Sequence, residues 1–268
     1  MTNANTYTGG TSVTGGTLYA NNTTGSATGY GAVNVASGGT LSGTGFIVPT
    51  TASGTNAVTE VSGGNITPGG VQPTVPFTGT PGTVAVGNLT LDPTNVSGTS
   101  QLLNAAASPN ATTPGLTFTL GAGNASSGSK LMVAGSAANV MNFNAGGTGS
   151  TSTVVSINDL VGGGLTLNQN YVLIQGNGNT TFEDNGQVLA IGNADNLVAA
   201  NGLIVGGLQL LTANTPGNFF ADWYGGSQLY LVGDDIDVEV IPEPGTWAMM
   251  LSGLALLLVL QRRKRKQS

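Results

Sequence analysis

The chain of 268 residues has no cysteine and no histidine, and only 7% of its residues are charged. Without cysteine there is no disulfide framework, thiol nucleophile or thiolate metal site. Without histidine there is no Ser-His-Asp machinery, no His-ligated zinc and no imidazole acid–base catalysis. These absences exclude most familiar catalytic chemistry, and we expect a protein that is not an enzyme and needs no cofactor or metal.

Basic residues are almost confined to one place. Lys130 stands alone, and the other five form the run 262–266. All twelve acidic residues precede that run, so the body is strongly acidic and has no basic patch. Such a body repels phosphate backbones, which argues against nucleic-acid binding. The asymmetry also indicates that the C-terminal segment has a separate task.

Short β-branched segments joined by Gly-Gly recur in the first hundred residues. The repeated units start at Val13, Val33 and Val58, and a looser copy starts at Val84. Alternating apolar and polar positions predict strands with one buried face, and the glycines predict sharp corners. Repeats of 20–26 residues favour a β-solenoid, in which stacked rungs make a continuous core. The alternative is a sandwich of unrelated β-hairpins.

The stretches Asn5–Val13, Gly15–Leu18 and Gly31–Val35 resemble the autotransporter-associated β-strand repeat of bacterial surface proteins. This resemblance, over about residues 3–70, implies a right-handed β-helix. We therefore expect an all-β fold with solenoid repeats over 1–97 and an irregular β-rich continuation over 98–241. Strand-like runs in the continuation are 116–120, 131–133, 153–157, 171–175, 188–191, 203–211 and 228–232, whereas 195–200 is ambiguous between strand and helix.

A Pro-Glu-Pro motif, an apolar run and the basic tail follow one another over 242–266. The fourteen residues 247–260 make a helix of about 21 Å, short of a bilayer core of about 30 Å, and snorkelling of the first arginines closes the gap. The sequence thus predicts one C-terminal transmembrane helix, with a buried helix of a globular domain as the alternative. The basic tail is expected in the cytoplasm and the body outside.

This arrangement resembles the PEP-CTERM sorting signal of Gram-negative bacteria. The resemblance implies a partner, the membrane enzyme exosortase, which reads the motif and cleaves near it. The precursor would sit transiently in the inner membrane, and the mature protein would reach the cell surface or the extracellular space, with exopolysaccharide as a further partner. The recognition element is Pro242, Glu243 and Pro244; the anchor comprises Trp247, Leu251, Leu254, Leu256, Leu257, Leu258, Val259 and Leu260; the cytoplasmic stop is Arg262, Arg263, Lys264, Arg265 and Lys266.

The N-terminus begins directly in a repeat-like unit, without a basic region, an apolar region or a cleavage site. Sorting of the proposed kind requires export. We therefore expect that the chain is the C-terminal piece of a longer protein with further rungs upstream.

Carboxylates and aromatics are the remaining candidates for chemistry. Glu183 and Asp184 precede Asn185-Gly186, a turn signature, and 234–240 reads as a strand with an acidic face. These acids could serve a secreted β-helix polysaccharide lyase or hydrolase, the alternative to a structural or adhesive surface protein. The aromatics are expected either to cap the solenoid or to bind sugars; they are Phe219, Phe220, Trp223 and Tyr224.

Overall fold

A computed structural model describes most of the body of the chain. The described residues all lie in one compact unit, 1–235, and the unit 236–268 lies outside them. The described ranges are 1–50, 56–71, 84–85, 87–93, 99–110, 112–120, 128–148, 150–159, 170–189, 197–200, 204–205, 208–210, 219–224 and 228–233.

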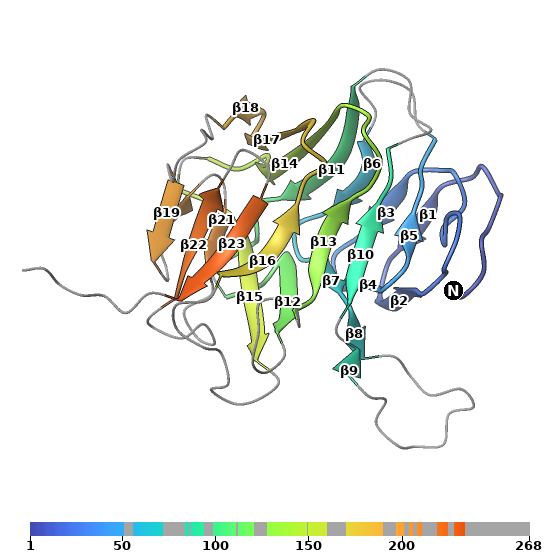
Figure 1. Cartoon of the computed structure of the whole chain (residues 1–268), viewed down its shortest axis with the longest axis horizontal. Helices are drawn as coiled ribbons and strands as arrows, with labels where there is room; N and C mark the ends of the chain where they lie inside the picture. The colour runs from blue at the N-terminus through green and yellow to red at the C-terminus, as the bar shows by residue number, and fades with distance from the viewer. Residues whose placement is uncertain are drawn as a thin grey trace, which may run out of the picture. The chain divides into compact units, whose positions relative to one another are not determined.

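The first of three seven-stranded sheets is parallel over six strands and ends in one antiparallel strand (Figure 1). As far as β17, each strand in it pairs with the strand that follows about one coil later in the sequence, as a solenoid requires. Its order is β1 (Thr11–Val13), β3 (Val33–Val35), β6 (Asn56–Glu60), β11 (Ser100–Ala106), β14 (Asn139–Ala145), β17 (Thr180–Asp184) and β18 (Gln187–Val188).

The second sheet follows the same plan. Parallel pairing runs from β2 to β21, and β20 pairs antiparallel at the end. Its order is β2 (Gly16–Ala20), β4 (Gly39–Gly43), β7 (Asn65–Pro68), β12 (Leu116–Leu120), β15 (Thr153–Asp159), β21 (Leu208–Leu210) and β20 (Ile204–Val205).

The third sheet is parallel only as far as β16, after which three antiparallel strands complete it. Its order is β5 (Phe46–Ile47), β10 (Asn88–Leu91), β13 (Lys130–Val133), β16 (Asn170–Gln175), β23 (Gln228–Gly233), β22 (Phe219–Tyr224) and β19 (Leu197–Ala200). A separate antiparallel pair consists of β8 (Gly70–Val71) and β9 (Val84–Ala85).

The chain visits the three sheets in a fixed order. After β3, β4 and β5 come β6, β7 and β10, then β11, β12 and β13, then β14, β15 and β16. Each such triplet is one rung, and successive rungs stack through parallel pairing. The prediction of an all-β, solenoid-like body is confirmed.

Columns of aliphatic side chains hold the rungs together. In the second sheet one inward column is buried at every rung after the first, because residues that pair in register face the same side of the sheet. Burying each of these side chains stabilises the fold by roughly 1.5–3 kcal/mol. The column is Leu18, Leu41, Ile66, Leu116 and Val155.

The Gly-Gly corners have two different causes. Gly38 has a φ of +80°, which glycine adopts without strain. Gly39 lies under the preceding rung, and a Cβ built there would be 2.1 Å from the carbonyl oxygen of Val13. The next corner shows the same two roles. Gly63 has a φ of +86°, and a Cβ built at Gly64 would be 2.6 Å from the carbonyl oxygen of Val35. One glycine turns the chain, and the next allows the rungs to stack.

Two sequence predictions fail on this fold. The looser repeat at Val84 does not add a strand to the first sheet, because Val84 pairs antiparallel with Val71 in the separate hairpin. The next strand of the first sheet is β11 instead. The sequence predicts one strand-like run at 203–211, and the described residues within it form two strands, β20 and β21, paired antiparallel. The ambiguous 195–200 is a strand where it is described, at β19.

The described part of the chain contains no helix, and hence none long and apolar enough to cross a membrane. The transmembrane helix that the sequence predicts over 247–260 lies outside the described residues.

Candidate functional site

The residues predicted to carry the sorting function all lie outside the described part of the chain. They comprise the Pro-Glu-Pro motif 242–244, the apolar segment 247–260 and the basic tail 262–266. The acidic segment 234–240 also lies outside it. The roles of these residues therefore remain predictions from the sequence, and the described body supplies the geometry discussed below.

Glu183 and Asp184 end strand β17 next to the predicted turn. Asn185 and Gly186 have φ values of 48° and 79°, and the flanking Asp184 and Gln187 pair across the hairpin. The turn prediction is confirmed, since positive φ at both central residues is the signature of a tight hairpin. Asp184 accepts a hydrogen bond of 3.0 Å from the Asn144 side-chain amide.

The two carboxylates do not converge on one site. Glu183 pairs in register with Asn142, whereas Asp184 pairs with the buried Phe143. Successive side chains of a strand point to opposite faces. Among the described residues, no three acidic side chains lie together where a metal ion could be held.

The aromatic cluster predicted at 219–224 forms strand β22. This strand lies beyond β16, between β19 and β23, where the third sheet changes from parallel to antiparallel pairing. Its backbone thus belongs to the terminal strands of the stack. Whether the rings cap the core or bind sugars stays a prediction, because these side chains lie outside the described residues.

A column of polar residues follows the outer face of the first sheet. Its members pair in register from one rung to the next, and only the last member carries an ionisable group. The column is Ser12, Asn34, Thr59, Asn104, Asn142 and Glu183.

Amide groups link neighbouring members of this polar column. The Asn142 side-chain nitrogen donates to Asn104 Oδ1 at 2.8 Å, and Asn142 Oδ1 accepts from the Gly186 backbone N–H at 2.9 Å. Asn34 is exposed and Thr59 half-buried. Asn142 is buried, and both atoms of its amide group are already engaged. Strands stack about 4.8 Å apart, so the accessible members from Ser12 to Asn104 offer donors and acceptors at a regular spacing. The alternation around Val33-Asn34-Val35 is the sequence signal from which this column could have been found.

A buried glutamate, Glu60, lies on the opposite face of the first sheet and was not singled out by the sequence analysis. It is 1% exposed, and its Oε2 accepts a hydrogen bond of 3.0 Å from the Ala106 backbone N–H. Desolvation by burial raises its pKa to about 8, although hydrogen bonds from the backbone of Ala106 and Gly64 lower it in part. Glu60 is therefore mostly protonated at neutral pH and is embedded in the core.

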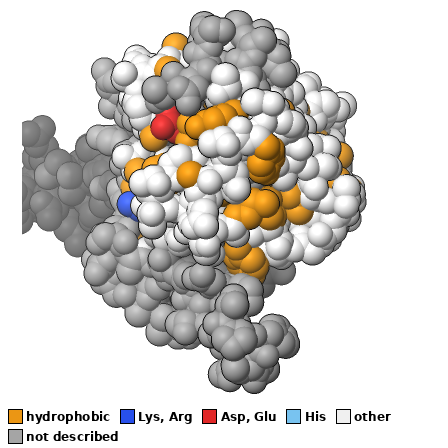
Figure 2. Space-filling view, turned by 90° about the vertical axis from the view of Figure 1, so that its right-hand side faces the viewer, with side chains coloured by type: hydrophobic (Ala, Val, Ile, Leu, Met, Phe, Trp, Pro, Cys, Tyr) orange, Lys and Arg blue, Asp and Glu red, His pale blue; other side chains and the backbone are white. Residues whose placement is uncertain are grey.

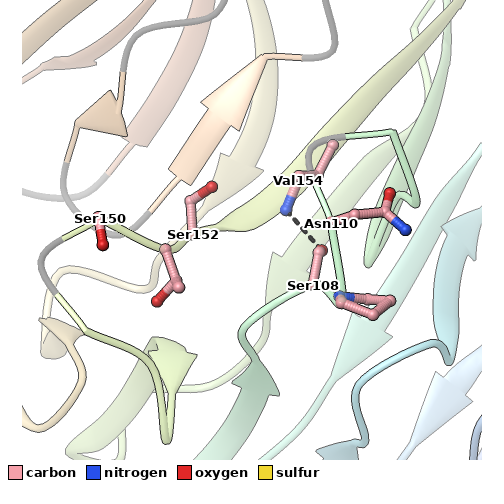
Figure 3. Close-up of a pocket in the computed structure, with 7 residues that line it drawn as sticks. Ser108, Asn110, Ser150, Ser152 and Val154 are labelled. Atoms are coloured by element: carbon pink, nitrogen blue, oxygen red, sulfur yellow. Dashed lines mark hydrogen bonds between the residues drawn. The ribbon is translucent and has the colours of Figure 1, made fainter.

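A small cavity lies where the connection after β11 approaches the connection before β15 (Figure 3). Hydroxyl and amide groups line most of it, and the Val154 backbone N–H donates to Ser108 Oγ at 2.9 Å across it. Its volume of about 120 Å³ is well below the 300–1,000 Å³ of typical ligand pockets. The outer face, rather than this cavity, is the better candidate for contact with a large ligand.

Neither the curated proteins nor the solved structures contain a match to this chain. The resemblance to the autotransporter-associated repeat therefore stays a prediction. A family model, the PEP-CTERM protein-sorting motif, matches residues 240–266. The matched segment contains Pro242, Glu243 and Pro244, the apolar run and the basic tail. The chain thus carries the sorting motif of proteins that exosortases process for export, joined to a solenoid-like body of parallel β-sheets.

Proposed function

We propose that this chain is a structural and adhesive scaffold of the bacterial surface or extracellular matrix. An exosortase holds and cleaves its C-terminal segment, and its body contacts exopolysaccharide. The sorting motif supports the export route. The observation that carries the adhesive role is the polar column, whose accessible members Ser12, Asn34, Thr59 and Asn104 offer uncharged hydrogen-bonding groups on four successive rungs.

The C-terminal segment suits a temporary anchor. Five adjacent basic residues favour retention of the tail in the cytoplasm, and the apolar run before them favours insertion into the inner membrane. Pro242 and Pro244 disfavour helix in the residues that precede them, so we expect an extended peptide at the outer surface. An extended peptide is a form that a protease can bind. In this proposal the processing enzyme recognises Glu243, which performs no chemistry itself.

A right-handed coil is the arrangement we propose for the body. Connections between parallel strands of one sheet are right-handed in nearly all known proteins. The fixed order in which the chain visits the three sheets is compatible with a single sense of winding. Every rung then presents its member of the polar column on the same face.

Weak contacts repeated along the column explain how the body could hold a polymer without a deep pocket. Each hydroxyl or amide contributes little, because it exchanges a hydrogen bond with water for one with the sugar. A polymer that engages several rungs at once gains avidity from their linkage. The low charge of the column suits a polymer that is neutral at the contacted positions.

Retention of the full chain on immobilised exopolysaccharide from the producing strain tests the adhesive role. Asn34→Ala combined with Thr59→Ala removes two accessible members of the polar column. We expect this variant to lower retention severalfold. The matched control, Thr17→Ala with Thr40→Ala, changes two paired residues of the second sheet and is expected to leave retention unchanged. No retention of the unaltered chain, or equal loss in both variants, would overturn the adhesive role.

A further inference from the structure

Two Asn-Gly dipeptides lie on either side of strand β17, and the fold holds them differently. Asn177-Gly178 lies in the corner that connects β16 to β17, and Asn185-Gly186 forms the turn between β17 and β18. Asparagine is chemically labile, and glycine after it hinders least the attack of its own backbone nitrogen on the asparagine side chain. The reactivity of each dipeptide therefore depends on whether this nitrogen is engaged and whether the side-chain carbonyl is polarised.

In the turn after β17 the attacking nitrogen is engaged. The Gly186 backbone N–H donates to Asn142 Oδ1 at 2.9 Å. The side chain of Asn185 is held as well, because its Oδ1 accepts from the Gly146 backbone N–H at 3.0 Å and its Nδ2 donates to the Gly147 carbonyl at 2.9 Å. A nitrogen whose proton is shared with an acceptor attacks poorly, and a side chain fixed at both atoms cannot swing toward it. This turn is therefore protected from cyclisation.

At Asn177 three donors surround the side-chain carbonyl instead. Asn177 Oδ1 accepts from the Asn179 backbone N–H at 2.9 Å, from the Thr180 hydroxyl at 3.1 Å and from the Asn139 side-chain amide at 3.2 Å. The Thr180 hydroxyl itself accepts from the Asn177 backbone N–H at 3.1 Å, which strengthens it as a donor. Attack on the amide places negative charge on Oδ1, and preorganised donors stabilise such charge.

The nitrogen that would attack Asn177 has no acceptor within the described part of the chain. None of the described residues accepts a hydrogen bond from the Gly178 backbone N–H, and Gly178 is exposed, so hydroxide can reach it. The nitrogen that would leave, Asn177 Nδ2, donates to the Ala137 carbonyl at 3.0 Å, which fixes the plane of the amide. The corner thus combines an available nucleophile with a polarised and oriented carbonyl.

A buried oxygen without a partner lies on the residue that supplies one of these donors. Asn139 is fully buried, and its Nδ2 donates both to Asn177 Oδ1 and to the Ala137 carbonyl, the latter at 3.0 Å. Asn139 Oδ1 has no hydrogen-bond partner in the described structure. Leaving such an oxygen unpaired is costly, and a catalytic role is one recognised reason for it. The fold bears this cost while it keeps the donor directed at Asn177.

We propose that Asn177-Gly178 is a self-modifying site, at which Asn177 becomes aspartate or isoaspartate in the folded chain. The Gly178 nitrogen bonds to Asn177 Cγ, the bond from Cγ to Nδ2 breaks, and Nδ2 leaves as ammonia with the proton of the Gly178 N–H. Water then opens the cyclic imide on either side. Both products lack Nδ2, so its hydrogen bonds to the carbonyls of Ala134 and Ala137 are lost and the corner loosens with time. This chemistry is independent of sorting and of glycan binding.

The product differs from the unmodified chain in charge. Charged side chains are sparse on the face of the molecule shown in Figure 2, where they appear only toward the left-hand side. Each conversion of Asn177 adds one carboxylate to a body that is already acidic. Modified and unmodified chains can therefore be separated by anion exchange before the site is identified.

The two dipeptides of one molecule provide a matched comparison. The full chain is incubated in detergent micelles at mildly alkaline pH, and mass spectrometry of its peptides gives the rate of conversion at each asparagine. In the folded chain we expect Asn177 to convert roughly tenfold faster than Asn185, and in concentrated urea the two rates should become similar. A folded chain in which Asn177 converts no faster than Asn185 would overturn the proposal.

Removal of single contacts tests the role of the donors. Thr180→Val deletes the hydroxyl and should slow conversion at Asn177 severalfold, whereas Thr180→Ser keeps a hydroxyl and should preserve the rate. The rate at Asn185 in the same molecules reports any general loosening of the fold. Asn142→Ala releases the Gly186 N–H and should accelerate conversion at Asn185 alone. An unchanged rate at Asn177 in Thr180→Val would show that the donors do not activate the carbonyl and would also overturn the proposal.

Discussion

Glu60 occupies the position that Val35 occupies one rung earlier. The two residues pair in register and face the core, and Val13 precedes them in the same column. A carboxyl group thus replaces an aliphatic side chain in the stack. Its neutral form can be buried at moderate cost, because the Ala106 backbone N–H donates to it.

The stability of the body should therefore depend on the ionisation of Glu60. Burial raises its pKa in the folded chain to about 8, against 4.5 when it is solvated. Between these values the unfolded chain has lost the proton that the folded chain keeps, so stability falls as pH rises from about 4.5 to about 8 and then levels off. We expect the free energy of unfolding in urea to drop by a few kcal/mol between pH 5 and pH 9.

The variant Glu60→Gln provides the control for this pH dependence. A neutral amide retains a group that can accept the Ala106 hydrogen bond but cannot ionise. Its unfolding free energy should change little between pH 5 and pH 9 compared with the unaltered chain. A pH profile as steep in the variant as in the unaltered chain would show that another group is responsible.

The two glycines of a corner should respond differently to alanine. Gly39→Ala forces a methyl group against the Val13 carbonyl, which belongs to the backbone and cannot move aside, so we expect a loss of several kcal/mol or failure to fold. At Gly38 nothing lies within 4 Å of an added Cβ, and Gly38→Ala costs only the strain of a positive φ, about 1–2 kcal/mol. The thermal unfolding midpoints of the two variants provide the measurement, and Gly39→Ala should lower the midpoint more than Gly38→Ala. Equal decreases in the two midpoints would contradict this prediction.

Truncation within the aliphatic column should weaken the stack. Leu41 is fully buried between Leu18 and Ile66. Leu41→Ala leaves a cavity and is expected to lower the free energy of unfolding by about 2–5 kcal/mol. Asn34→Ala, at an exposed position of the adjacent sheet, should change it by less than about 0.5 kcal/mol. Urea unfolding of both variants provides the comparison, and a small effect at Leu41 would mean that the column is not part of a packed core.

Substitution of the sorting motif should block cleavage of the chain and its release from the inner membrane. With Pro242, Glu243 and Pro244 changed to alanine, we expect the uncleaved precursor to accumulate in the inner-membrane fraction of cells that contain the exosortase. Asp237→Ala, just upstream, is the control and should be processed normally. Immunoblots of membrane and culture fractions give the readout. Normal release of the triple-alanine chain would exclude the motif as the recognition element.

Much of this fold could be predicted from local pattern. The run 116–120 coincides with β12, because alternating apolar residues favour a strand. The run 171–175 lies within β16, and its four consecutive apolar residues favour a strand buried on both faces. The Gly-Gly pairs at 38–39 and 63–64 predict the corners, because glycine adopts the positive φ of a sharp turn. The inward position of Glu60 can also be predicted from the sequence, because Val58-Thr59-Glu60 repeats the alternation of Val33-Asn34-Val35.

The length of each rung could not be predicted in the same way. Val33 pairs with Val58, but Val58 pairs with Leu103, because the excursion that contains β8 and β9 is inserted into one rung. Val84 has the spacing of a further repeat and yet belongs to that excursion. Which strands pair depends on how whole rungs stack on one another. The spacing of a sequence repeat does not show where an insertion lengthens one rung.

The most direct test of the account is the mass of the C-terminal peptide of the protein recovered outside producing cells. If an exosortase removes the anchor, this peptide ends near Pro242–Pro244, and the apolar run and basic tail are missing. Recovery of extracellular protein that still carries Arg262 to Lys266 would contradict the account.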